Sequence, residues 1–573
     1  MKLSKFARRC GILFVVAVAC PALAATITVT NINDDGAGSL RAAIAAASPG
    51  DTINFALTYP ATITLSSTLT ITQNLTIQGP GASNLSISGN RAVLVLSVSP
   101  GVTAVVSGLT IEWGDTFSSE GSSGAGINNA GSLALTNSTV SNNYAYVGGG
   151  IYNTGALTIT SSTVSDNLAT LGGGIWNSGT LTVNFSTVSN YADASGGGMV
   201  NNGGTVTISN STFLGNAIDA FCAGGIWNED GMVTVAGSTF SQNSSACGGG
   251  ILNDGTLIVI NSTFTGNRGQ VGGGVLNNGT LTLTNSTFSD NGSADGGAIY
   301  NGGTLNIKNT ILADNGGNCA GAVAISAGHN LSDDASCDFG GVGDLNSTPA
   351  GLDPAGLQNN GGSTQTIALL FTSPAVNAIP VSPLNYCSLS DGVTPVATDQ
   401  RGMIRPQLQN CDIGAYEFAT ANSLIAAVES QISESMSGGN RTDRLELQQA
   451  LAELSTALST KNWNGSDGNH LNQSHAARFF LEEELAAGEL TLVLVNKRSQ
   501  IPIQQVQTDL NNLTFANRVL AAVAISDAAG KNPILLSWAS SELAEGDQAT
   551  AARDYNAAIG AYAAAWTFAE SAM

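Results

Sequence analysis

A six-residue motif recurs along the chain at a nearly constant interval, and this repeat constrains the fold more than any other feature. Gly-Gly-Gly-Ile-Tyr-Asn at 148–153 returns as Gly-Gly-Gly-Ile-Trp-Asn at 172–177. Related copies lie at 124–129, 196–201, 224–228, 248–253, 272–277 and 296–301. The intervals between their aligned apolar residues are 24, 24, 24, 27, 25, 24 and 24 residues. Each copy continues into an alternating stretch such as Leu157-Thr158-Ile159, the pattern of a short β-strand.

An interval of 24 residues fits one coil of a solenoid made of three short strands. Tetratricopeptide and ankyrin repeats are longer and helical, and a propeller blade needs more residues. Successive coils of such a solenoid lie one strand spacing apart, about 4.8 Å, so equivalent positions stack directly. The sequence therefore predicts a mainly β protein, a right-handed parallel β-helix over residues 25–418.

Stacking explains which residue types recur. The apolar residue of each motif is expected to point inward and form a buried column: Ile127, Ile151, Ile175, Met199, Ile226, Ile251, Val275 and Ile299. A second column would contain Val164, Phe213, Phe240, Phe264 and Phe288. Stacked asparagines can hydrogen-bond into a ladder, and the motif supplies Asn153, Asn177, Asn201, Asn228, Asn253, Asn277 and Asn301. A further asparagine recurs at 143, 167, 216, 243, 267 and 291, with Tyr191 interrupting that series.

The cysteines and the N-terminus predict export. Residues 1–24 resemble a signal peptide, with basic residues before a short apolar run and Ala22-Leu23-Ala24 as a cleavage site. The alternative is a lipoprotein signal that makes Cys20 the lipidated residue. Cleavage after Ala24 leaves six cysteines, an even number typical of disulfides in exported proteins. No other segment is apolar enough to span a membrane, so the mature chain is expected to be secreted, extracellular or on the cell surface.

The repeat itself predicts one disulfide. Cys222 and Cys247 each lie four residues before the inward isoleucine of adjacent coils, close to the Cα separation of about 5.5 Å that a disulfide needs. Proximity in sequence favours Cys319 with Cys337 and Cys387 with Cys411.

Charge and missing motifs exclude several functions. The formal net charge is −22, and no lysine or arginine occurs between Arg91 and Arg268, which argues against nucleic acid as a partner. The chain has no HExxH, GxSxG or phosphate-binding loop. His329, His470 and His475 do not have a metal-ligand spacing, so neither a metal nor a cofactor is expected.

Three stretches resemble known families. Gly-Gly-Ala-Ile at 296–299, with Phe288-Ser289-Asp290-Asn291, resembles the repeat of polymorphic outer-membrane proteins. The segments 38–44 and 51–55 resemble the N-terminal cap of secreted bacterial β-helix proteins. Residues 399–406 and 411–417 resemble a choice-of-anchor Q domain, covering about 310–418. The resemblance implies a surface or secreted protein, and no named activity. The chain departs from it in lacking an LPxTG-like signal, a basic transmembrane tail or a barrel translocator.

Composition changes after about Phe418, where glycine becomes sparse and alanine, leucine, glutamate and glutamine rise. Leu447, Leu451, Leu454 and Leu458 lie on one helical face, and Tyr555, Ile559, Tyr562 and Trp566 repeat that spacing. Residues 420–573 are therefore predicted to be a small α-helical bundle with these stripes in its core. Together with the anchor-Q region, the bundle is expected to cover the C-terminal end of the solenoid.

Three candidate sites follow from the stacking. Tyr152, Trp176, Trp227 and Tyr300 each follow the inward residue by one, so alternation points them outward as a strip for a glycan or a protein, unless the glycine-rich loops or the helices cover it. Glu229 and Asp254 stack on adjacent coils about 5 Å apart, near the spacing of retaining glycosidases. That pair could instead hold Ca²⁺, or be two solvated turn carboxylates. The longest coil adds residues near 216–221, where Asp219 lies beside Asp193.

Two functions are compatible with these sequence features. The first is a non-catalytic, adhesin-like surface protein that presents a rigid wall to a glycan or protein. The alternative is a polysaccharide-degrading lyase or glycoside hydrolase, because many such enzymes are parallel β-helices, although fold alone does not decide activity. The absence of lysine and arginine from residues 92–267 counts against a lyase that uses such a base there.

Overall fold

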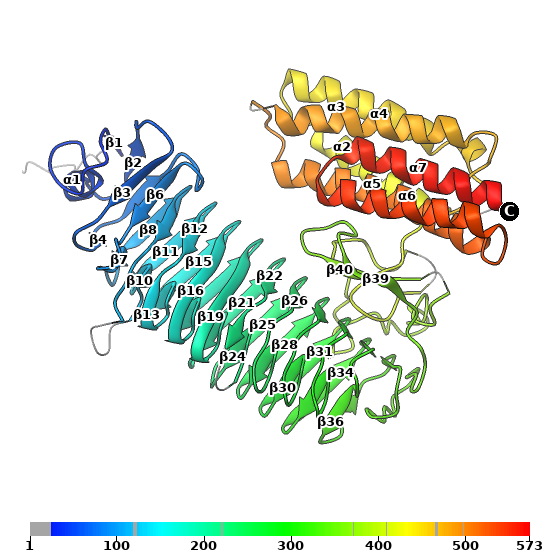
Figure 1. Ribbon diagram of the computed structural model, residues 1–573, viewed down its shortest axis with the longest axis horizontal. Helices are drawn as coiled ribbons and strands as arrows, with labels where there is room; N and C mark the ends of the chain where they lie inside the picture. The colour runs from blue at the N-terminus through cyan, green and yellow to red at the C-terminus, as the bar shows by residue number, and fades with distance from the viewer. Residues whose placement is uncertain are drawn as a thin grey trace, which may run out of the picture.

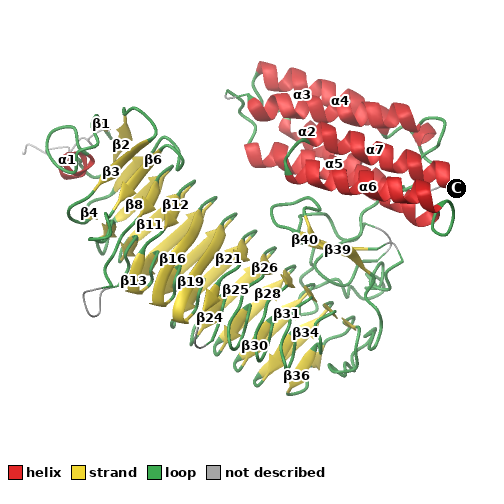
Figure 2. Ribbon diagram, viewed as in Figure 1, coloured by secondary structure: helices red, strands yellow, loops and turns green. Residues whose placement is uncertain are grey.

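The computed structural model describes residues 24–117, 123–218, 222–370, 372–407, 410–464, 468–496 and 498–573. It contains a long parallel β-solenoid, a short antiparallel hairpin and a helical bundle (Figures 1 and 2). The predicted signal peptide, apart from Ala24, and Cys20 lie outside the described residues.

Three parallel sheets run the length of the solenoid. Sheet A contains β1 (Thr26–Val29), β2 (Asp51–Phe55), β5 (Leu75–Gln78), β8 (Thr103–Ser107), β11 (Ser132–Thr136), β15 (Ala156–Thr160), β18 (Thr180–Asn184), β21 (Thr205–Ser209), β25 (Met232–Ala236), β28 (Thr256–Ile260), β31 (Thr280–Thr284), β34 (Thr304–Lys308) and β37 (Ile325–Ser326). Sheet B contains β3 (Ala61–Thr64), β6 (Leu85–Ser88), β9 (Thr110–Glu112), β12 (Thr139–Ser141), β13 (Tyr144–Val147), β16 (Thr163–Leu171), β19 (Thr187–Ser195), β22 (Thr212–Leu214), β23 (Ala217–Ile218), β26 (Thr239–Ser241), β29 (Thr263–Thr265), β32 (Thr287–Ser289), β35 (Ile311–Ala313) and β38 (Leu331–Ser332). Sheet C contains β4 (Leu69–Ile71), β7 (Leu96–Val98), β10 (Ile127–Asn129), β14 (Ile151–Asn153), β17 (Ile175–Asn177), β20 (Met199–Asn201), β24 (Ile226–Asn228), β27 (Ile251–Asn253), β30 (Val275–Asn277), β33 (Ile299–Asn301) and β36 (Cys319–Gly321).

The register between coils confirms the predicted repeat. Ile151 pairs with Ile175 in sheet C, and Val164 pairs with Val188 in sheet B. The inward isoleucines are fully buried, as are the stacked phenylalanines. Phe213, Phe240, Phe264 and Phe288 stack with ring centroids 4.5–4.8 Å apart. The core is therefore a set of continuous apolar columns parallel to the solenoid axis.

Two asparagine ladders provide hydrogen bonds for the polar groups of the buried turns. In the first, each Nδ2 donates to the Oδ1 of the next coil at 2.7–2.9 Å, and the ladder joins Asn129, Asn153, Asn177, Asn201, Asn228, Asn253, Asn277 and Asn301. The second ladder does not break at Tyr191, because Asn190 takes the position. Asn167 donates to Asn190 at 2.9 Å, and the backbone N–H of Asn190 donates to Asn216 at 2.7 Å. The corner between Val188 and Asn190 is one residue shorter than in the other coils, so Asn190 does not lie at the spacing that the other asparagines share.

All three predicted disulfides are present. Their Cα separations are 4.6 Å for Cys222–Cys247, 4.9 Å for Cys319–Cys337 and 6.1 Å for Cys387–Cys411. The first joins equivalent positions of adjacent coils, as the repeat predicted.

Each end of the solenoid is covered by a short segment. At the N-terminal end, Leu40 and Ile44 of helix α1 (Leu40–Ala46) are buried against the solenoid core (Figure 1). At the other end, Cys337 and Phe339 join the same core. The helical bundle lies beside the solenoid, where Gln504 donates a hydrogen bond to Ser161, rather than on its end, contrary to the expectation from sequence (Figure 1).

Within the predicted 25–418 unit, the coils stop at β38, and the chain then folds back along the solenoid. The antiparallel hairpin of β39 (Leu352–Gln358) and β40 (Thr366–Leu369) lies between the coils and the helices (Figure 1). Gln400 Nε2 donates to Thr239 Oγ1 at 2.9 Å, and the N–H of Ala415 donates to Thr287 Oγ1 at 3.0 Å. We call residues 346–418 the fold-back layer.

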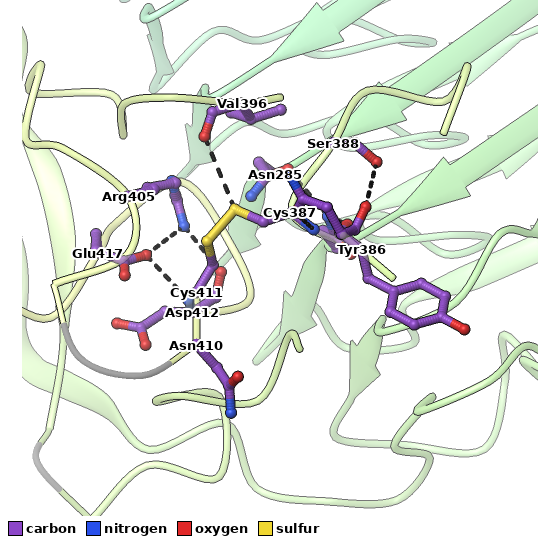
Figure 3. Close-up of a disulfide and its surroundings, with 12 residues drawn as sticks. Asn285, Tyr386, Cys387, Ser388, Val396, Arg405, Asn410, Cys411, Asp412 and Glu417 are labelled. Atoms are coloured by element: carbon purple, nitrogen blue, oxygen red, sulfur yellow. Dashed lines mark hydrogen bonds and ion pairs between the residues drawn. A yellow bond between two sulfur atoms is a disulfide. The ribbon is translucent and has the colours of Figure 1, made fainter. Parts of the chain in front are cut away.

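Buried charges and a disulfide hold the fold-back layer together (Figure 3). Arg405 pairs with Glu417 at 2.7 Å beside the Cys387–Cys411 disulfide, and both charged side chains are almost fully buried. Burial, reinforced by the nearby Glu417 carboxylate, raises the pKa of Asp412 to about 8.

The C-terminal region is helical, as predicted. It contains α2 (Ala421–Ser435), α3 (Arg441–Ala457), the 3₁₀ turn η1 (Thr460–Asn462), α4 (Ala476–Val495), α5 (Ile503–Asp527), α6 (Pro533–Ala551) and α7 (Tyr555–Ala572). The stripe Tyr555, Ile559, Tyr562 and Trp566 is buried in the bundle core. Among the described helices, none has the length and apolar character needed to cross a bilayer.

Candidate functional site

The predicted aromatic strip lies along the outer face of sheet C. Tyr152, Trp176, Trp227 and Tyr300 occupy the middle positions of β14, β17, β24 and β33, and each is half-buried. The aliphatic residues between them are buried: Val200 is 1% exposed, Leu252 7% and Leu276 8%. The strip is continuous, but its aromatic members form most of its accessible surface. We call it the wall strip.

The aromatic rings of the wall strip differ in how much of each ring is available to a ligand. Tyr152 and Trp176 stack on each other, with centroids 4.5 Å apart and planes 7° from parallel. One face of each ring is therefore already in use. Trp227 instead lies between the shorter Val200 and Leu252, and its Nε1–H donates to Asp254 Oδ2 on the next coil at 2.8 Å. This bond fixes the orientation of the indole.

A polar row accompanies the wall strip two residues further along each coil. Glu229 accepts a hydrogen bond from Asn202 on the preceding coil. Asp254 accepts from Trp227 and, at 2.8 Å, from Asn278 on the following coil. Glu229 thus takes its N–H donor from the preceding coil, and Asp254 takes donors from both neighbouring coils. They can serve as hydrogen-bond acceptors for hydroxyl groups beside the aromatic rings.

One comparison with known proteins bears on this surface. A family model of the right-handed β-helix region matches residues 62–240 and 196–335. Together the matches span the coils from β3 to β38, which carry the wall strip.

The chain is a right-handed β-helix protein.

No curated protein shows significant similarity to it. The β-helix match identifies the architecture of the wall, whereas the chemistry of the wall depends on the residues that it carries.

The other candidates from sequence are scattered over the β-helix. Asp193 is exposed on β19, where its charge adds to the effect of burial in raising the pKa of Tyr144. Asp219 lies outside the described residues. No group of three or more histidine, cysteine or acidic side chains suited to a metal occurs in the part of the chain that the structure describes.

The histidines of the β-helix protein have separate surroundings. His329 is buried with its ring 4.7 Å from that of Tyr386, and burial lowers its pKa. His470 pairs with Asp527 at 2.8 Å in the helical bundle. His475 lies next to Ser474, whose hydroxyl is 3.1 Å from its Nδ1.

The structure also forms a cleft that the repeat could not reveal. It lies between the solenoid corner at Phe185, the β39–β40 loop and the start of α5, and we call it the amide cleft. Its lining includes Gln358, Asn359, Gln365, Gln504, Gln507 and Asn511. One feature of the sequence could have indicated the cleft, namely four polar residues spaced to lie on one face of α5: Gln504, Gln507, Thr508 and Asn511.

Proposed function

We propose that this β-helix protein is a non-catalytic extracellular scaffold whose wall strip binds a glycan. The observation that carries the proposal is the Trp227–Asp254 hydrogen bond, because it holds a large aromatic ring in place between buried aliphatic neighbours. A fixed aromatic ring beside hydrogen-bond acceptors suits a sugar, which has an apolar face and a rim of hydroxyls.

The proposed location follows from the cysteines and the leader. Three disulfides suit a protein that matures in an oxidising compartment. The signal peptide and the surface-protein resemblance of residues 296–299 and 411–417 favour the same place, in the medium or at the cell surface.

A polysaccharide-degrading enzyme is the second candidate. Glu229 and Asp254 favour it, because two carboxylates stand on adjacent coils beside a tryptophan. Their hydrogen bonds favour the first candidate. Asn202 engages Glu229 while Trp227 and Asn278 engage Asp254, whereas an acid and a nucleophile must both face the scissile bond.

A glycan-array screen on residues 25–573, with release of reducing ends measured for every hit, separates the two. We expect binding without release, and an affinity roughly tenfold lower in Trp227→Ala, because the main stacking surface is lost. Trp176→Ala should weaken binding less, since one face of that ring is covered by Tyr152.

Two control variants sharpen the screen. Tyr146 is 46% exposed on β13 of sheet B and is not part of the wall strip, so Tyr146→Ala should bind normally. Glu229→Gln should keep most of the binding. Release of reducing ends that disappears in Glu229→Gln would establish the enzyme and refute the scaffold.

A further inference from the structure

The amide cleft is large enough for a ligand and lies on a different side of the coil from the wall strip. Two hollows of about 530 and 340 Å³ adjoin there and share Phe185, Gly362, Ser363 and Thr508 in their linings. Ligand pockets typically measure about 300–1,000 Å³. The corner at Phe185 joins sheets A and B, whereas the wall strip is on sheet C.

Phe185 is the residue that sets this corner apart. Its φ is +48°, in the left-handed region that disfavours bulky side chains. Other coils fill the equivalent position with Asn137, Ser161, Asn210, Gly237, Asn261, Asn285 and Asn309, all with positive φ. The ring is 39% exposed and borders both hollows. A strained, exposed aromatic residue at a cleft indicates a role in binding, since it contributes little to the core.

Amide side chains face Phe185 from α5. Within the described part of the chain, the side-chain amides of Gln507 and Asn511 have no hydrogen-bonding partner, although both border the cleft. Gln504, one turn earlier, donates to Ser161 Oγ at 3.0 Å and ties the helix to the solenoid. Two amides thus remain available to bind hydroxyl groups as donors and acceptors.

The opposite side of the cleft is rigid. Thr364 Oγ1 donates to the Gly237 carbonyl at 3.0 Å, and Thr239 Oγ1 donates to the Gln365 carbonyl at 2.6 Å. These bonds dock the β39–β40 loop onto the coil next to Phe185. A ligand would therefore meet a preorganised surface and lose little affinity to ordering it.

Most charged groups that border the cleft are paired, and among the described residues Arg553 is the one without an ion pair. Arg518 pairs with Asp547 at 2.8 Å and with Asp353 at 3.1 Å. Asp399 and Arg401 form a second, buried pair. The chain as a whole carries a net charge of −22, which repels anions. With a single unpaired cation, Arg553, among amides, hydroxyls and an aromatic ring, the cleft favours an uncharged, polyhydroxylated ligand.

We propose that the amide cleft binds an uncharged oligosaccharide, with the Phe185 ring against one sugar face and the Gln507 and Asn511 amides on its hydroxyls. This site is separate from the wall strip, and the proposal for the cleft does not depend on the proposal for the strip.

The test is calorimetric titration of residues 25–573 with cello-, xylo-, manno- and chito-oligosaccharides, and with polygalacturonate as an anionic comparison. At least one uncharged series should bind. Phe185→Ala and Phe185→Asn should each lower its affinity roughly tenfold. The double variant Gln507→Ala/Asn511→Ala should lower it by a similar factor, because two hydrogen-bonding groups are lost.

Tyr146→Ala is the matched control. It removes an exposed aromatic side chain from the solenoid but leaves the amide cleft intact, so the cleft affinity should not change. Absence of binding to every uncharged series would overturn the proposal. Binding lost only in Trp227→Ala would also overturn it, while supporting the wall strip. Phe185→Asn is expected to fold normally, because asparagine is the residue that most other coils have at this corner. A loss of affinity in this variant therefore reports the loss of the ring.

Discussion

Phe185 shows how one residue can conflict with the repeat around it. From β8 to β34, the residue that follows each sheet-A strand has a positive φ, which asparagine and glycine accept and large side chains resist. Burial of the Phe185 side chain does not compensate for the backbone strain, since 39% of the residue is exposed. A solenoid selected for stability alone would place asparagine here, as the corners at 210, 261 and 285 do.

Phe185→Asn is therefore expected to stabilise the solenoid by about 1 kcal/mol, the approximate cost of a left-handed backbone for a bulky residue. The measurement is the shift in denaturant midpoint of the β-sheet signal. Asn137→Phe, which places the same ring at an equivalent exposed corner, should destabilise by a similar amount. A lower midpoint for Phe185→Asn would mean that the ring is needed for folding, and would contradict this interpretation of the strain.

At the scale of elements, the coils could be predicted from the sequence and the fold-back layer could not. Stacked coils translate each position by one strand spacing, so spacing alone located the isoleucine column, the first asparagine ladder and Cys222–Cys247. Asn190 was missed because one residue is absent from its corner. The amide cleft depends on where α5 docks, and the Gln504–Ser161 contact joins residues 343 apart with no repeat between them.

Helix α4 carries an ionisable group that the apolar stripes did not reveal. Glu483 is fully buried, and one of its oxygens lacks a hydrogen-bond partner among the described residues. Burial raises the pKa of Glu483 to about 8, and burial likewise raises the pKa of Asp509 on α5 to about 7. These carboxyls bind a proton more tightly in the folded bundle than in the unfolded chain. The bundle is therefore expected to lose stability as the pH rises from the unfolded value of 4.5 for Glu483 toward 8.

Glu483→Gln tests this pH dependence. Glutamine keeps the shape of the protonated acid but cannot ionise, so the variant should be more stable than the parent at pH 8, by about 4 kcal/mol. At pH 4 the two should differ little. Denaturation followed by the helical signal at both pH values measures the effect, and Glu484→Gln is the exposed control on the same helix. Equal stability of variant and parent at pH 8 would show that Glu483 ionises without cost.

For the whole molecule, the strongly negative charge bears on both proposed surfaces. The chain carries 41 acidic and 19 basic residues, yet the wall strip is aromatic and aliphatic, and the charged groups of the amide cleft other than Arg553 are paired with one another. No lysine or arginine occurs in the coils between Arg91 and Arg268. An acidic polysaccharide would be repelled at long range and would find few cations to bind at contact. An uncharged glycan would not be repelled and would need no cations.

Salt should therefore have little effect on the binding of uncharged oligosaccharides. Raising the ionic strength from about 0.01 M to 1 M shortens the screening length from about 30 Å to 3 Å, and the affinity should change by less than about twofold because no ion pair forms with the ligand. Titrations at both ionic strengths measure this, with polygalacturonate as the charged control. An affinity that falls roughly tenfold or more with salt would mean that charged groups hold the ligand. Polygalacturonate binding that requires Ca²⁺ would instead point to carboxylates such as Glu229 and Asp254 bridged to the glycan by the ion.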